Sequence, residues 1–143
     1  MASELYDKGL KIRREVMSDF YVDRALNGAI GFSEPLQDLV TAYCWGAVWG
    51  REDLDRRTRS LINVAMLTAL NRPYELEAHV RGALNNGCTV AEIRETLLQA
   101  TAYCGFPAGI DAFRTARGAL EAAGALDGRD SGPAPMDAAE TVS

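Results

Sequence analysis

The sequence predicts an all-α fold for a chain of 143 residues. Apolar residues recur at helical spacing along most of the chain, and no segment alternates between apolar and polar side chains for long enough to predict a strand. Residues that favour turns and helix ends separate the periodic segments. The expected helices span residues 3–18, 23–29, 34–49, 56–70, 73–86, 90–104 and 107–123.

Capping residues predict where several of these helices begin and end. Ser33 and Asp55 are expected N-caps, because their side chains can accept a hydrogen bond from the first helical turn. Thr89 followed by Glu92 fits a capping box, in which each side chain bonds to the backbone of the other residue. The pair Asn86-Gly87 is typical of a left-handed C-terminal cap.

The helical pattern assigns residues 1–125 to one domain and residues 126–143 to a flexible tail. From Leu126 onward the composition shifts to Gly, Pro, Asp, Ser and Ala, without aromatic residues. Such a segment buries too little apolar surface to offset the entropy lost on ordering. The segment 61–70 differs, because it is apolar on nearly every face, as expected of a helix at the domain centre or at a subunit interface.

Charge and cysteine usage exclude several classes of partner. The net charge is −5, and Lys8 and Lys11 are the only lysines, which argues against binding to nucleic acid. The three cysteines lack C-x-x-C spacing and follow no signal peptide, so we expect a cytoplasmic protein without a disulfide framework. The longest apolar stretch is too short to cross a bilayer, so no membrane association is expected.

Metal and cofactor sites also lack sequence support. One histidine and no cysteine cluster provide too few ligands for zinc. There is no glycine-rich nucleotide motif, and both lysines fall in the first helix, where a pyridoxal Schiff base in the core is not expected. An enzyme with this sequence is expected to use neither a metal nor a cofactor.

The histidine is the first candidate for chemistry. His79 follows Glu75 by four residues on one face of the helix 73–86, so the carboxylate can orient the ring and raise its pKa. Arg72 precedes this helix. The alternative is that neither residue has a chemical role. His79 would then be a packed or solvated side chain, and Glu75 would be an acidic residue in the first turn that interacts favourably with the helix dipole.

Four further residues are candidates for binding an anionic substrate. Arg59 directly precedes the apolar segment 61–70, so we expect its guanidinium to be partly enclosed and able to bind a carboxylate. Trp45 begins an aromatic wall with the tryptophan four residues later, a pattern that is also common in protein cores. Tyr103 and Phe106 flank a glycine and are candidates for lining the mouth of a cavity.

Six segments, in their order and spacing, carry a resemblance to a known family. They are Ala42-Tyr43-Cys44-Trp45-Gly46, Thr58-Arg59-Ser60-Leu61-Ile62, Ala69-Leu70-Asn71-Arg72, Glu75-Leu76-Glu77-Ala78-His79, Arg81-Gly82-Ala83-Leu84-Asn85-Asn86-Gly87 and Tyr103-Cys104-Gly105-Phe106-Pro107-Ala108. From Tyr6 through Leu120 the chain resembles the carboxymuconolactone decarboxylase family of the alkylhydroperoxidase D-like superfamily. The resemblance implies an all-helical homotrimer or homohexamer.

The resemblance also implies an activity and roles for the candidate residues. The implied reaction is the cofactor-free decarboxylation of 4-carboxymuconolactone, an anionic lactone, to 3-oxoadipate enol-lactone in the protocatechuate branch of the β-ketoadipate pathway. His79 would donate the proton, oriented by Glu75. Arg72 and Arg59 would bind a carboxylate or stabilise the oxyanion, and Trp45, Tyr103 and Phe106 would supply an apolar wall.

Two alternatives are compatible with the same segments, and a third, a peroxidase, is not. The protein could act on another lactone or enol acid, or it could be a non-catalytic member that keeps only the fold. Peroxidases of the superfamily carry Glu-x11-Cys-x2-Cys-x3-His. With their histidine placed at His79, Ser60, Arg72 and Glu75 stand where the glutamate and the two cysteines would be. The thiol chemistry is therefore missing.

Overall fold

The protein is described here by a computed structural model that places residues 2–130. Every regular element in this range is a helix, which confirms the predicted all-α fold. The elements are α1 (Ala2–Met17), α2 (Asp19–Asn27), α3 (Glu34–Leu39), the π-helix η1 (Val40–Val48), α4 (Arg56–Ala69), α5 (Pro73–Asn85), α6 (Val90–Cys104) and α7 (Phe106–Ala122).

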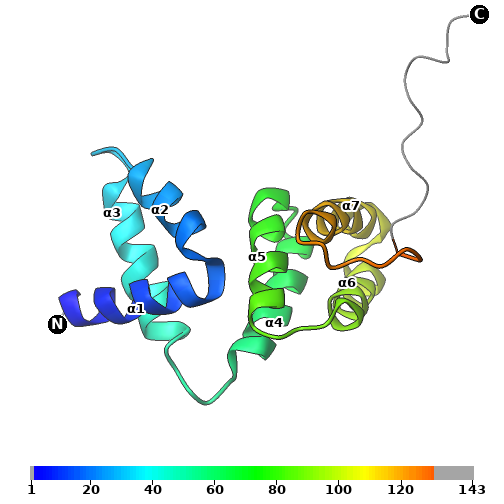
Figure 1. Ribbon diagram of the computed structural model, residues 1–143, viewed down its shortest axis with the longest axis horizontal. Coiled ribbons are helices and arrows are strands. Elements are labelled where there is room, and N and C mark those ends of the chain that lie inside the picture. Colours follow the sequence, from blue (N-terminus) through cyan, green and yellow to red (C-terminus); the bar gives the residue numbers. More distant parts are fainter. Residues whose placement is uncertain (1, 131–143) are drawn as a thin grey trace, which may run out of the picture.

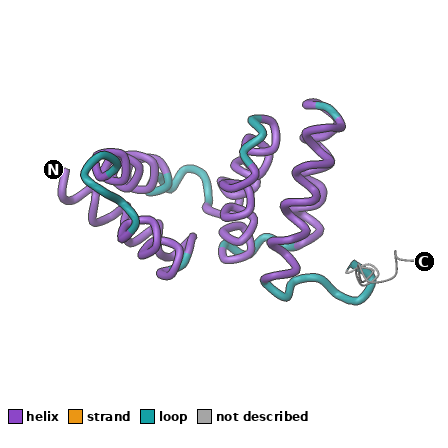
Figure 2. Tube along the Cα trace, turned by 90° about the horizontal axis from the view of Figure 1, so that it is seen from above, coloured by secondary structure: helices purple, strands orange, loops and turns teal. Residues whose placement is uncertain are grey.

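The helices form two groups that meet at α5. Figure 1 shows α1, α2 and α3 on one side and α4, α6 and α7 on the other, with a single connection from η1 to α4. The same division is visible from above in Figure 2. α1 packs against η1 and α5, whereas α4, α5, α6 and α7 pack against one another. α5 is therefore the element that both groups share.

Three of the predicted helix ends are confirmed in the C-terminal group. The carboxylate of Asp55 accepts a hydrogen bond from the N–H of Thr58 at 2.7 Å. The capping box is complete, with Thr89 accepting from the N–H of Glu92 at 3.1 Å and Glu92 accepting from the N–H of Thr89 at 3.0 Å. Gly87 has a φ of 86°, the left-handed conformation expected of a helix C-terminal cap.

One helix start and one predicted side-chain cap differ from the sequence prediction. α2 begins at Asp19, four residues earlier than expected, because the hydroxyl of Ser18 accepts a hydrogen bond from Tyr21 and caps the helix. α3 begins at Glu34 as expected and Ser33 is at its N-cap position, but the predicted side-chain cap is wrong, because the hydroxyl of Ser33 bonds to the backbone of Ile30 instead.

The expected helix 34–49 is divided into α3 and η1. In η1 the N–H of Trp49 donates to the carbonyl of Cys44 at 3.0 Å, an i to i−5 bond. Gly9 of α1 and Gly46 of η1 allow the two helices to approach closely. A Cβ at either position would overlap backbone atoms of the other helix. Thr41 of η1 accepts a hydrogen bond from Arg13 of α1 next to this contact.

Each group has its own buried cluster. Val64, Leu76, Ile93 and Leu97 belong to the cluster between α4, α5, α6 and α7, and Leu126 packs against it. Residues 127–130 of the predicted tail are also described by the structure, whereas residues 131–143 lie outside the described residues. The second cluster joins α1, α2, η1 and α5; its members are Ile12, Val16, Met17, Val22, Trp45, Trp49 and Ala78.

The apolar segment 61–70 is buried on one side only. Ser60, Val64 and Thr68 are buried, whereas Ile62 and Met66 remain exposed on the opposite face. Among the described residues no helix is both long enough and apolar enough to span a membrane.

Candidate functional site

His79 lies in α5 at the boundary between the two groups of helices. Its ring stacks on that of Trp45 from η1, with 6.2 Å between the ring centroids and 3° between the planes. Trp45 in turn stacks on Trp49 at 4.8 Å, so the predicted aromatic wall exists and is buried. From the other side, Nδ2 of Asn63 in α4 lies 3.5 Å from Nδ1 of His79.

This environment determines the protonation state of the ring. The contact between Asn63 Nδ2 and His79 Nδ1 matches the neutral tautomer that carries its hydrogen on Nε2, with the amide as donor. Burial lowers the pKa of His79 to about 4, and the negative charge of Glu75 raises it by less. The direction expected for Glu75 is confirmed. The net direction is opposite to the sequence prediction, because desolvation of the imidazolium outweighs the carboxylate. Asn63, which the sequence analysis missed, makes the orienting contact.

The two predicted arginines have different surroundings. Arg59 is partly buried and donates to the carbonyls of Leu54 and Arg51, at 3.2 and 3.3 Å, so it holds the connection between the two groups of helices. It shares a face of α4 with Asn63, one turn away. Arg72 is the exposed N-cap residue of α5, and its guanidinium has no ion-pair partner within residues 2–130.

The predicted aromatic residues do not all meet at His79. Trp45 is in contact with the histidine ring. Tyr103 and Phe106 lie at the α6–α7 corner, where their side chains are 83% and 72% exposed. Neither ring stacks on His79 in the described chain.

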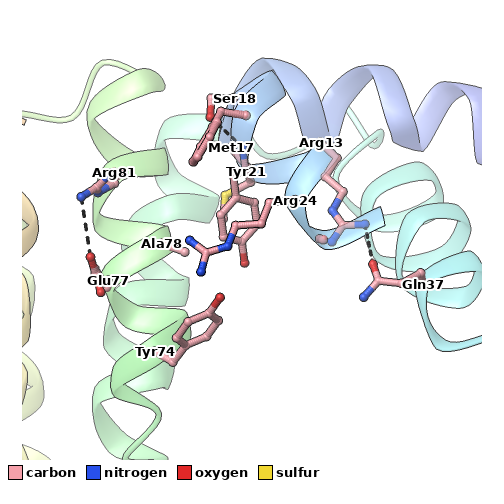
Figure 3. Close-up of a pocket in the computed structure, with 12 residues that line it drawn as sticks. Arg13, Met17, Ser18, Tyr21, Arg24, Gln37, Tyr74, Glu77, Ala78 and Arg81 are labelled. Atoms are coloured by element: carbon pink, nitrogen blue, oxygen red, sulfur yellow. Dashed lines mark hydrogen bonds and ion pairs between the residues drawn. The ribbon is translucent and has the colours of Figure 1, made fainter. Parts of the chain in front are cut away.

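The structure adds a cavity that the sequence analysis did not identify (Figure 3). It lies between α1, α2, α3 and α5 and has a volume of about 510 Å³. Arg13, Tyr21, Arg24 and Tyr74 are among its lining residues.

The sequence does contain a signal for this cavity. Gly9, Ile12, Arg13 and Val16 follow helical spacing on the buried face of α1, so Arg13 is a charged residue at an apolar-face position. Within residues 2–130, no three His, Cys, Asp or Glu side chains are grouped closely enough to hold a metal ion.

Comparison with known proteins agrees with this architecture. The model of the Carboxymuconolactone decarboxylase family matches residues 34–118. A nitrosuccinic acid decarboxylase, npaB, from Metarhizium robertsii is 45% identical over 108 residues, which cover 76% of this chain and 76% of that protein. A 4-carboxymuconolactone decarboxylase from Acinetobacter baylyi is 41% identical over 103 residues, covering 72% of this chain and 77% of that protein. The predicted resemblance is confirmed: the chain belongs to the carboxymuconolactone decarboxylase family.

Proposed function

We propose that the protein is a carboxy-lyase that decarboxylates a small anionic acid without a cofactor. Its family and the two decarboxylases among its relatives support the reaction class. In this chain itself, the observation that supports the proposal is the position of His79, the only histidine of the sequence, between Trp45 and Asn63. The first candidate substrate is 4-carboxymuconolactone, as part of protocatechuate catabolism in the cytoplasm.

The proposed reaction needs no external electron acceptor. The bond between the ring carbon and its carboxylate breaks, carbon dioxide leaves, and the electron pair moves through the ring alkene into the lactone carbonyl. The resulting dienolate then takes one proton at the carbon next to that carbonyl. The protein must bind the acid, stabilise the oxyanion and deliver the proton.

His79 fits the last two tasks in sequence. In the substrate complex an Nε2–H of the ring can donate a hydrogen bond to the developing oxyanion. A bound anion beside the ring favours the imidazolium and raises its pKa from about 4, so the ring can take up a proton from solvent when substrate binds and give it to the dienolate carbon. Glu75 assists this protonation through its charge. Arg72 and Arg59 remain candidates for the carboxylate clamp, and Trp45, Tyr103 and Phe106 for the apolar wall.

Nitrosuccinic acid is the second candidate substrate, favoured by the 45% identity to a decarboxylase of that acid. A nitro group next to the scissile carboxylate accepts the electron pair as a nitronate, which then requires one proton. Both candidates therefore carry their own electron acceptor and place the same demands on the protein. Other lactones or enol acids, or a non-catalytic family member, are the remaining alternatives.

Carbon dioxide release by the purified protein tests the proposal. We expect release from 4-carboxymuconolactone or from nitrosuccinic acid, with a His79→Gln variant as the control for the site. The ratio of kcat/KM for the two acids then selects the substrate. Turnover of neither acid by the folded protein would contradict the proposed activity on these substrates.

We also propose that the protein assembles as a homotrimer or homohexamer. Many large apolar side chains are exposed in the single chain, among them Phe32, Met66, Tyr103, Phe106 and Ile110. A monomer rarely exposes so many, so covering by further copies is the expected explanation. Light scattering at micromolar concentration tests this, and a stable monomer would contradict it.

A further inference from the structure

Arg13 is a buried cation without a counterion. Its side chain belongs to a residue that is only 5% exposed. Nη1 donates to the amide oxygen of Gln37 at 3.0 Å and to the hydroxyl of Thr41 at 3.1 Å, both neutral groups. Nε has no partner, and no carboxylate pairs with the guanidinium within residues 2–130.

Burying Arg13 in this way lowers the stability of the fold when no ligand is bound. An arginine stays charged at neutral pH, and a buried charge that lacks an opposite charge loses hydration without an equivalent return. The electrostatic influences on Arg13 come from the side chains of Tyr21, Cys44 and Tyr6, none of which is a carboxylate. An apolar residue would fill the same position on α1 at less cost. The chain therefore retains a cation where an anion from outside would complete its coordination.

The cavity beside Arg13 has room for such an anion. Its volume of about 510 Å³ is within the range of small-molecule sites. Three arginines and one glutamate line it, and Glu77 pairs with Arg81 at 3.6 Å. Arg24 has no carboxylate partner in the described chain, and Figure 3 shows its guanidinium directed into the space between α2 and α5. Two uncompensated cations thus remain.

The cavity and His79 lie on neighbouring faces of α5. Tyr74 and Ala78 line the cavity, whereas Glu75 and His79 occupy the adjacent row, each one position further along the helix. The charge of Glu75 acts both on His79 and on Tyr21, which lines the cavity.

From these observations we infer that the cavity between α1, α2, α3 and α5 is a binding site for a small dicarboxylate, with Arg13 as the buried anion receptor and Arg24 as the second cation at the cavity. This deepens the proposed function, on which it rests for its place in the reaction. Arg13 would hold a carboxylate that is not lost, while the reacting carbon faces His79.

Succinate is a suitable probe, because it is a dicarboxylate without an electron acceptor and is not expected to be decarboxylated. Calorimetric titration at low salt should show binding to the full-length protein. Arg13→Gln and Arg24→Gln should each weaken binding by about 10-fold or more, since each removes a charge-assisted contact. Arg129→Gln removes the same charge at a side chain that is 92% exposed, and it should bind as the wild type does.

The possible outcomes separate this inference from the proposed function. If Arg13→Gln does not fold, Arg24→Gln, at an exposed position, still decides. Absence of succinate binding, or unchanged binding in both arginine variants, would overturn the dicarboxylate site. Succinate binding that depends on the arginines, without decarboxylation of either acid, would uphold the site and contradict the proposed function instead.

Discussion

The two groups of helices that meet at α5 are packed in different ways. The cluster shared by α4 to α7 is apolar throughout and includes the closely spaced Ala112, Ala116 and Ala119 of α7. The cluster between α1, η1 and the other side of α5 is built around Trp45 and Trp49, and a charged residue is buried next to it. One side has the properties of a scaffold, and the other has those of a site.

The family match follows the same division. It begins at residue 34, so it includes η1 and α4 to α7 up to residue 118 but not α1 and α2. Trp45, Asn63 and His79 therefore lie in the matched part, whereas Arg13 and Arg24 precede it. In our proposal the matched part performs the chemistry, and α1 with α2 helps to select the acid.

The largest effect is expected at the boundary between the two groups. His79→Gln should lower kcat by about 10²- to 10⁴-fold, the usual contribution of a general acid, while the fold survives. The fold should survive for two reasons. The glutamine side chain keeps a polar atom that can bond to Asn63, and the His79 ring lies at the edge of the two buried clusters rather than inside either of them. Steady-state kinetics on the substrate found by carbon dioxide release provides the measurement, with circular dichroism as the folding control. A kcat near the wild-type value would show that His79 only packs in the structure and does not donate the proton.

The two predicted arginines should give separable effects. Arg72→Ala should raise KM about 10- to 150-fold if this exposed guanidinium contacts a carboxylate, with no change in melting temperature. Arg59→Ala should also lower the melting temperature, because its bonds to the 51–54 connection are lost. Arg114→Ala, on the exposed face of α7, is the control for lost charge. Unchanged kinetics in both variants would show that residues other than Arg59 and Arg72 bind the substrate carboxylate.

The sequence predicts local structure well where a side chain bonds to its own neighbourhood. The caps at Asp55, Thr89 and Gly87 depend on contacts within a few residues, and they are confirmed. The pKa of His79 depends on burial by η1 and α4, which are distant in sequence. Helical periodicity therefore predicts that Glu75 and His79 share a helix face, but it does not predict that the imidazolium is desolvated. Arg13 was missed for a related reason: its missing counterion becomes visible only when α2, α3 and α5 enclose it.

A smaller, directional effect is expected from Glu75→Gln. The carboxylate raises the pKa of His79, so its neutral amide should lower that pKa further below about 4. The imidazolium that forms in the substrate complex is the proposed proton donor, so turnover is retained at pH values below its pKa in that complex and lost above it, and the pH profile of kcat should shift to lower pH. Glu121→Gln is the matched control, because Glu121 pairs with Arg117 on α7 and is not among the residues that line the cavity. A shift to higher pH would contradict the assigned role.

The smallest effect is expected in the scaffold itself, at the start of α6. Thr89→Ala removes one side of the capping box and should destabilise the protein by about 1 kcal/mol, a decrease in melting temperature of about 3 °C at fixed protein concentration. Thr96→Ala is the matched control, because its hydroxyl only bonds back to the carbonyl of Glu92 within the helix. The cap is on the side of α4 away from η1, so kcat and KM should not change below the melting transition. A substantial change in kcat for folded Thr89→Ala would show that α6 contributes to the site, and the division between scaffold and site would then fail.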